Sequence, residues 1–290
     1  MIDVLLEPFA DGIGQRALIA VVVVGSVCGP LGVWILLFRQ TYAAESISHA
    51  MLPGLVIAAL SGFPLLLGAA GGVLAAAAAI ALAGRDERVG PDVAVAAVIT
   101  TLFGLGASLA LSPDAPPRIG ELLFGDLLGV GEEDLLATGL LAAVVVGVLA
   151  GAHRALALAA FDPVGARSLG TRPGRIALLL LVLLGLTTVA AVQALGNLLV
   201  LALIVAPAAA SLNLTSRLGP ALALAAALTV AAGVSGLYLS WYLDLAGGAS
   251  VALCAVGLFG LSLLRRPRRA APDAVRVSGR GPIDVFGGTR

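Results

Sequence analysis

The amino-acid sequence predicts an all-α fold, a polytopic bundle of transmembrane helices. Of its 290 residues, 60% are hydrophobic and 12% are charged, whereas a soluble domain has roughly 25% charged residues. The mean hydropathy is +1.07, and the apolar runs are long and repeated. Because these runs are continuous and do not alternate between apolar and polar residues, they favour membrane-spanning helices over the strands of a β-barrel.

Breaks of polar or Gly/Pro-rich sequence divide the chain into nine expected spans. A helix needs roughly 20 apolar residues to cross the hydrocarbon core of a bilayer. The expected spans are residues 15–38, 41–60, 64–83, 91–111, 134–153, 175–194, 196–215, 220–242 and 248–264. The last three lie close together in the sequence, so an arrangement of eight spans stays open.

The arginine residues predict the orientation of the bundle. The chain has no lysine, and all 17 of its basic residues are arginine. Basic residues gather on the cytoplasmic side of membrane proteins. If Arg39 is cytoplasmic, nine alternating spans place every arginine on that side except Arg16 and Arg118. The N-terminus is then outside and the C-terminus inside, which requires an odd number of spans and favours nine.

The chain is expected to form one membrane domain, residues 1–264, followed by a tail. Residues 1–14 mix apolar and acidic side chains and indicate a short interfacial segment on the outer surface. Residues 265–290 mix Arg, Pro, Gly and Asp without a period, which is typical of a disordered cytoplasmic tail. The arginine cluster of this tail suits membrane lipid head groups, and no nucleic-acid partner is expected.

Small residues predict close packing between helices. The chain has 37 Gly, and pairs such as Gly25 and Gly29, or Gly147 and Gly151, are four residues apart on one helix face. This spacing permits two helix backbones to approach. It supports a tightly packed bundle and says nothing about a substrate.

Glu45 and His49 are the most informative polar pair in the sequence. They lie four residues apart within the apolar stretch Thr41 to Leu60, so on a helix their side chains share one face. Ionisable groups within a membrane span are costly and usually mark a substrate or ion path. An imidazole and a carboxylate together can form half of a site for a divalent transition metal. Two ligands are too few for a tight site, which is compatible with a conduit that the metal must leave.

Other polar side chains within spans are candidates to line the same path and complete the metal coordination. These residues are Thr100, Thr101, Gln193 and Asn197. The commoner role of such a residue is a hydrogen bond between helices, as polar side chains in membrane bundles often form.

The stretch 154–174 is the longest expected cytoplasmic connection. Within it, Asp162 followed by Pro163 is a typical helix start, with Asp as the N-cap and Pro at the first helical position. Gly170 could end this helix. A short helix on the cytoplasmic side suits docking to a partner, although an ordinary amphipathic connector would have the same pattern. The chain has no P-loop and is therefore not expected to be an enzyme that hydrolyses ATP.

Five strings, in this order and spacing, resemble the permease of bacterial metal-uptake ABC importers, a family that serves zinc, manganese and sometimes iron. The resemblance covers roughly Gly29 to Leu264. The strings are Gly29-Pro30-Leu31-Gly32, Ser46 to Gly54, Leu123-Phe124-Gly125-Asp126-Leu127-Leu128, Phe161-Asp162-Pro163 through Leu169-Gly170, and Gly196-Asn197-Leu198 through Ala210.

The resemblance implies a homodimer in the bacterial inner membrane, with cytoplasmic ATP-binding subunits and an extracytoplasmic metal-binding protein as partners. It implies that Glu45 and His49 coordinate the transported ion, although the family usually has Asp at position 45. It also implies that the loop between spans contacts the ATPase through a coupling helix. The residues of that helix and its flanks are Phe161, Asp162, Pro163, Arg167, Leu169 and Gly170.

We therefore expect the chain to be the permease of an ATP-driven importer of divalent metal. No permanently bound cofactor is expected, and the cargo is Zn²⁺ or Mn²⁺, with Fe as a further possibility. Two alternatives stay open, a proton-coupled secondary metal transporter and an ABC permease for iron chelates. A membrane protein without transport activity is a third class, and it would show no metal flux.

Overall fold

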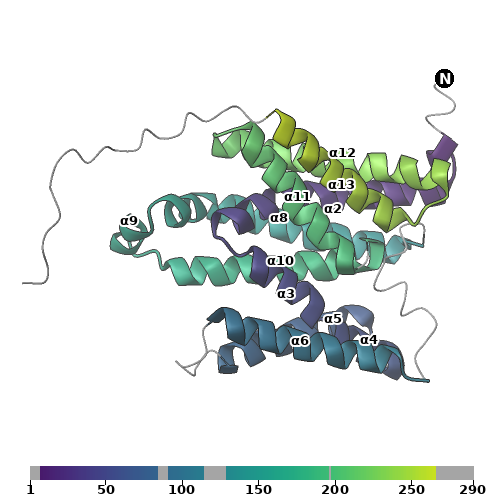
Figure 1. Ribbon diagram of the computed structural model, residues 1–290, viewed down its shortest axis with the longest axis horizontal. Coiled ribbons are helices and arrows are strands. Elements are labelled where there is room, and N and C mark those ends of the chain that lie inside the picture. Colours follow the sequence, from purple (N-terminus) through teal and green to yellow (C-terminus); the bar gives the residue numbers. More distant parts are fainter. Residues whose placement is uncertain (1–6, 84–90, 114–128, 196, 266–290) are drawn as a thin grey trace, which may run out of the picture.

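The computed structural model describes residues 7–83, 91–113, 129–195 and 197–265. All regular structure in these ranges is helical, which confirms the predicted all-α fold. After a short 3-10 helix, η1 (Glu7–Phe9), the helices follow in the order shown in Figure 1. They are α2 (Gly12–Leu37), α3 (Thr41–Ala50), α4 (Leu52–Ser61), α5 (Leu65–Ala83), α6 (Pro91–Ala110), α8 (Glu132–Phe161), α9 (Pro163–Ser168), α10 (Pro173–Leu195), α11 (Asn197–Leu214), α12 (Leu218–Leu243) and α13 (Gly247–Leu264).

Six helical stretches are long and apolar enough to cross a membrane by length and composition. They are Gly12–Leu37, Ala44–Ser61, Glu132–Phe161, Gly174–Ala191, Leu218–Leu243 and Gly247–Leu264. Three shorter apolar stretches, Leu67–Ala76, Val95–Ala110 and Val200–Leu214, coincide with the other three expected spans. The structure therefore supports a multi-span helical protein, while the count of nine and the orientation of the termini stay predictions.

The larger part of the molecule is a bundle built around α2. This helix packs against α8, α10, α11 and α12, and α13 covers α11 and α12 (Figure 1). Glycine permits the closest approach, because a Cβ atom on Gly32 would lie 1.9 Å from the Ile204 carbonyl oxygen of α11. A Cβ atom on Gly29 would lie 2.5 Å from the Ala225 carbonyl oxygen of α12. The bundle thus brings backbones into contact, as small residues in membrane helices allow.

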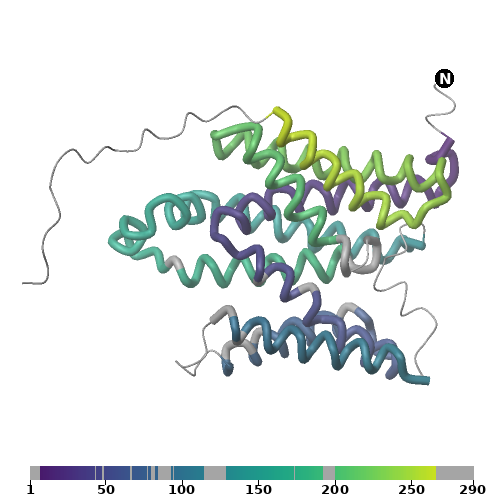
Figure 2. Tube along the Cα trace, in the orientation of Figure 1, coloured from purple at the N-terminus to yellow at the C-terminus, as the bar shows by residue number. Residues whose placement is uncertain are grey.

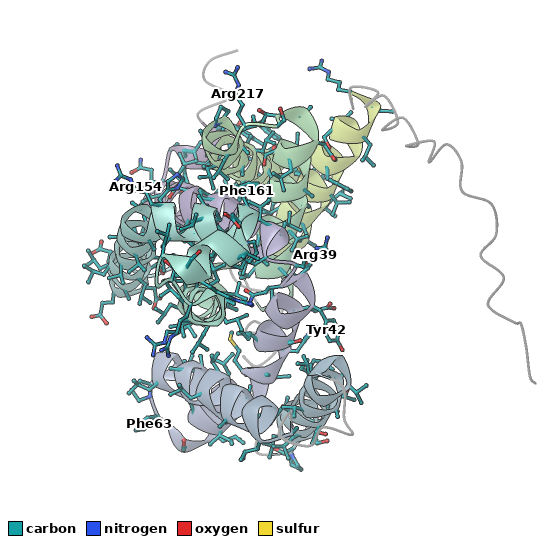
Figure 3. The ribbon with its side chains drawn as sticks, turned by 90° about the vertical axis from the view of Figure 1, so that its left-hand side faces the viewer. Arg39, Tyr42, Phe63, Arg154, Phe161 and Arg217 are labelled. Carbon is teal, nitrogen blue, oxygen red and sulfur yellow. The ribbon has the colours of Figure 1, made fainter. Side chains whose placement is uncertain are left out.

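The helices α4, α5 and α6 form a smaller layer beside this bundle, and α3 runs between the two parts (Figures 1 and 2). The layer is also held by glycines, since a Cβ atom on Gly54 would lie 2.1 Å from the Gly68 carbonyl oxygen of α5. Figure 3 shows Tyr42 of α3 between the larger bundle and the layer that carries Phe63. The predicted metal pair therefore lies on the element that joins the two parts.

The expected interfacial segment at 1–14 is described from residue 7 onward. Pro8 of η1 is buried, and the Gln15 side-chain amide donates to the Phe9 carbonyl over 3.2 Å. The Asp11 carboxylate accepts from the Gly14 N–H over 2.8 Å and caps α2, so this helix begins at Gly12. The described part of the segment thus packs on α2. Residues 1–6 and the expected tail beyond Arg265 lie outside the described residues.

Candidate metal site

The helical stretch that carries Glu45 and His49 is interrupted in its hydrogen bonding at Met51. Pro53 has no N–H, so it cannot donate to the His49 carbonyl four residues earlier. That carbonyl instead accepts from the N–H of Met51, where α3 gives way to α4. Met51 itself keeps helical dihedrals, with φ −79° and ψ −15°. Pro53 therefore weakens the helix directly after His49.

Glu45 and His49 lie one turn apart on α3 and differ in exposure. Glu45 is exposed and His49 is half-buried. Ser46, between them in sequence, is buried and donates its hydroxyl to the Tyr42 carbonyl within the same helix. The carboxylate therefore reaches the surface of the chain, while the imidazole lies further inside.

The imidazole of His49 is held by an aromatic contact rather than by a hydrogen bond to Nδ1. Its ring stands edge-on to the ring of Phe103 in α6, with centroids 5.2 Å apart and an interplanar angle of 76°. Nδ1 is buried and has no hydrogen-bond partner among the described residues. Buried ring nitrogens are normally satisfied by a partner. An unsatisfied one beside a carboxylate on the same helix face is suited to bind a cation.

The position of α6 against the break in α3–α4 explains how the His49 ring is oriented. A Cβ atom on Gly106 would lie 2.9 Å from the Leu52 Cγ and the Pro53 nitrogen, so α6 lies directly on the break. Phe103 precedes Gly106 by three residues and therefore lies on the same side of α6. The contact between α6 and the break thus determines how close the Phe103 ring lies to the His49 ring.

Of the four candidate path-lining residues, the structure describes the side chains of two, Thr100 and Thr101. Thr100 and Thr101 of α6 are both exposed, and the Thr101 hydroxyl donates to the Ala97 carbonyl over 2.8 Å. Thr100 lies three residues before Phe103 and so shares the side of α6 that faces His49. Gln193 and Asn197 lie near the end of α10 and at the start of α11, and their side chains lie outside the described structure.

The described residues do not form a complete metal site from charged and sulfur-bearing side chains. In the described ranges, no three His, Cys, Asp or Glu residues lie close enough together to hold a metal ion. Among these residues, Glu45 and His49 are a pair rather than a full set of ligands, and a metal site in proteins usually has four or more.

A hairpin of α8 and α10, with α9 at its tip, forms the predicted cytoplasmic connection (Figure 1). The Asp162 carboxylate accepts from the Gly165 N–H over 2.8 Å, and Pro163 is the first residue of α9, as the sequence predicted. Gly170 has φ +81°, a left-handed conformation that glycine adopts without strain. α8 extends to Phe161, so the first part of the stretch 154–174 is helical rather than a loop.

Several apolar and basic side chains of this tip are exposed. Phe161 and Leu169 are 65% and 75% exposed, and Arg167 is also exposed. Ala166 is buried, so α9 has one face against the hairpin and another free of it. Figure 3 looks toward this end of the molecule and labels Phe161. An apolar patch beside a basic residue has the composition of a docking surface.

Sequence reasoning missed the aromatic neighbours of both histidines. Nothing in the pattern of α6 separates Phe103 from the other apolar residues, because apolar residues occur all around this helix. Similarly, the ring of His153, to which we assign no metal role, stands edge-on to Trp34 with centroids 5.6 Å apart. Both contacts join residues distant in sequence, and they become visible only once the neighbouring helices are placed.

Comparison with known proteins relates the chain to membrane transport proteins. A family model described as the ABC 3 transport family matches residues 11–266. The chain is 37% identical over 256 residues to the manganese transport system membrane protein MntC of Halalkalibacterium halodurans, which covers 88% of each chain. It is 32% identical over 251 residues to the chelated iron transport system membrane protein YfeC of Yersinia pestis, which covers 87% of this chain and 85% of the relative.

A solved structure has the same fold. It is described as PsaBC from Streptococcus pneumoniae in complex with Fab, and it superposes with a TM-score of 0.85. The sequence identity is 28%, and the match covers 92% of this chain and 97% of that chain.

Proposed function

The chain belongs to the ABC 3 transport family, and on this premise we propose that it imports manganese or zinc ions as one subunit of an ATP-driven transporter. It is a multi-pass membrane permease for metal import, like the relatives named above. The finer assignment to a divalent ion is supported by the imidazole–carboxylate pair of α3. These ligands accept both Mn²⁺ and Zn²⁺, whereas a bulky chelate has no need for two adjacent side-chain ligands.

We assign the metal ligands to Glu45 and His49. The observation that carries this assignment is the buried Nδ1 of His49, which has no protein partner in the described structure and lies one turn from an exposed carboxylate. The described residues of one chain offer only this pair, and we propose that a second copy of the chain supplies the other pair. Two carboxylates and two imidazoles make a four-coordinate site of the kind that zinc prefers, and water can enlarge it for manganese.

The proposed transport cycle uses the α3–α4 break and the α8–α10 hairpin. An external metal-binding protein delivers the ion to the outer face of the dimer, and Glu45 and His49 hold it briefly within the membrane. A cytoplasmic ATP-binding subunit docks on the tip that carries Phe161, Asp162, Pro163, Arg167, Leu169 and Gly170. ATP-driven movement of this tip then reorients α3. Nine spans, with the N-terminus outside and the C-terminus inside, place the tip in the cytoplasm.

Metal uptake into vesicles tests the proposal. The permease is reconstituted with its cognate ATPase and metal-binding protein, and Mn²⁺, Zn²⁺ and a ferric chelate are supplied separately. We expect ATP-dependent uptake of Mn²⁺ or Zn²⁺. His49→Gln should lower it at least about tenfold, because losing even an outer-shell partner of a ligand typically costs about 10- to 100-fold.

Two matched variants control for general damage to the fold. His153→Gln changes the other histidine, which contacts Trp34 in the larger bundle, and it should leave uptake unchanged. Glu45→Gln tests the carboxylate ligand in the same way as His49→Gln tests the imidazole. Its control is Glu133→Gln, which removes an exposed carboxylate at the start of α8. Uptake that needs a proton gradient but no ATP would favour the secondary transporter. Uptake of the ferric chelate alone would favour the chelate permease.

A further inference from the structure

Gln40 connects the helix that carries the metal pair to α10. It is the last residue before α3, and its backbone carbonyl accepts from the Ala44 N–H over 2.9 Å. Short polar side chains at an N-cap position usually bond back to the helix start, whereas the longer Gln40 side chain makes no such bond. Its amide nitrogen instead donates to the Ala177 carbonyl of α10 over 3.3 Å.

The backbone of the α2–α3 turn is fixed at its other end to α2. The Gln40 N–H donates to the Ile35 carbonyl over 2.9 Å, and the Arg39 N–H donates to the Leu36 carbonyl over 3.1 Å. These bonds resemble the closure that ends many helices, in which glycine usually takes the left-handed position. Here Arg39 takes it, with φ +57°. The turn is therefore a tight, defined joint, and Gln40 is its one side-chain link to α10 in the described structure.

Ala177 lies close to the tip that faces the ATPase in our proposal. It is in the second turn of α10, about 6 Å along the helix axis from the first residue, Pro173. α9 packs on both α8 and α10. Glu45 follows Gln40 by five residues on α3. The hydrogen bond from Gln40 to Ala177 thus lies on the path between the tip of the hairpin and the metal pair.

The second polar atom of the Gln40 side chain indicates that this contact is incomplete in the present state. Oε1 is buried and has no hydrogen-bond partner among the described residues. A buried acceptor without a partner destabilises the state in which it is found. A shift of α3 against α10 that gives this acceptor a partner would remove that cost, so the contact favours movement of α3 away from its present position.

We propose that Gln40 is a positioning residue that transmits movement of α10 to the metal-bearing helix α3. The inference rests on the proposed function and adds a residue outside both the assigned metal ligands and the tip of the hairpin. Because coupling between two sites is reciprocal, the same contact would transmit occupancy of the metal site back to the ATPase. Loss of the contact should therefore separate ATP hydrolysis from transport and leave each site intact.

The experiment measures the number of metal ions imported per ATP hydrolysed in vesicles that contain the full transporter. Gln40→Met keeps the length of the side chain and removes its donor and acceptor. We expect this ratio to fall by about 2- to 12-fold, the equivalent of one ordinary hydrogen bond. Stimulation of ATP hydrolysis by Mn²⁺ should weaken in parallel. Equilibrium binding of Mn²⁺ to the permease should stay within about 2-fold of wild type.

Thr138→Val is the matched control. The Thr138 hydroxyl of α8 also donates to a carbonyl of α10, that of Ala190, over 3.1 Å, but far along α10 from the tip. This variant loses the same kind of bond and should keep the wild-type ratio. If Gln40→Met does not assemble with the ATPase, Gln40→Asn is judged by the same ratio, because its side chain is too short to reach Ala177.

The outcomes distinguish this inference from the proposed function. If the number of ions imported per ATP is unchanged in the Gln40 variants, or falls equally in Thr138→Val, Gln40 does not have the proposed role. ATP-driven uptake by the wild type would still support the proposed function. A parallel loss of Mn²⁺ binding would also overturn it, since the residue would then act on the metal site itself. Absence of ATP-driven uptake in the wild-type transporter would overturn both.

Discussion

Gly106→Ala tests whether α6 positions the metal site through its contact with the α3–α4 break. The added Cβ would lie 2.9 Å from the Leu52 Cγ and the Pro53 nitrogen, whereas ordinary contacts begin at 3.4 Å. The Leu52 side chain can rotate away, but the backbone nitrogen of Pro53 cannot. Helix α6 must therefore move outward by several tenths of an ångström.

Gly104→Ala provides the reference for the magnitude, because a Cβ atom on Gly104 would meet nothing within 4 Å. Both variants gain helix propensity, about 1 kcal/mol for Gly to Ala in a helix interior. Only Gly106→Ala adds overpacking, which costs about 1 to 3 kcal/mol. The free energies of unfolding of the two variants should therefore differ by about 1 to 3 kcal/mol, with Gly106→Ala the less stable.

The assay combines unfolding of the purified permease in detergent with equilibrium binding of Mn²⁺. Since α6 also carries Phe103 against His49, Gly106→Ala should weaken Mn²⁺ binding as well as stability. Gly104→Ala should leave binding unchanged. Equal stability and equal Mn²⁺ affinity of the two variants would refute the idea that α6 on the break orients the His49 ring.

Three further predictions concern the hairpin, the break and the bundle. Asp162→Ala removes the N-cap of α9, so it should destabilise this helix by about 1 kcal/mol and weaken binding of the ATPase, whereas Asp162→Asn keeps the cap. Equal affinity of the two variants for the ATPase would contradict this prediction. Pro53→Ala restores a donor for the His49 carbonyl, so the new amide at position 53 should be protected from hydrogen exchange and metal uptake should slow. An unprotected amide at position 53 would show that Pro53 does not cause the break. In denaturant unfolding, Gly32→Ala should destabilise the protein by about 3 kcal/mol more than Gly147→Ala, because only a Cβ atom on Gly32 would meet a neighbouring backbone. Similar free energies of unfolding for the two variants would exclude the close contact of α2 with α11.

Local signals in the sequence predicted local structure well. The Asp162–Pro163 pair predicted the start of α9, and Gly170 predicted its end. Both predictions depend on hydrogen bonds within a few residues of chain. Such bonds follow from the chemistry of the residues themselves, and the rest of the fold does not need to be known.

Contacts between helices could not be predicted in the same way. Gly25 and Gly29 share a spacing with Gly147 and Gly151, yet only the first pair meets another helix, α12. Helices that are apolar on every side carry no periodic pattern to show which face is buried. For the same reason the sequence identified Glu45 and His49 but not Phe103 or Gln40, whose roles depend on which helices are neighbours.

The most direct test of the proposed metal site is the stoichiometry of Mn²⁺ bound to the purified permease dimer. We predict one bound ion for two chains in the wild type and in His153→Gln, and none at the same concentration in His49→Gln. Binding of Mn²⁺ to His49→Gln with wild-type stoichiometry and affinity would contradict it.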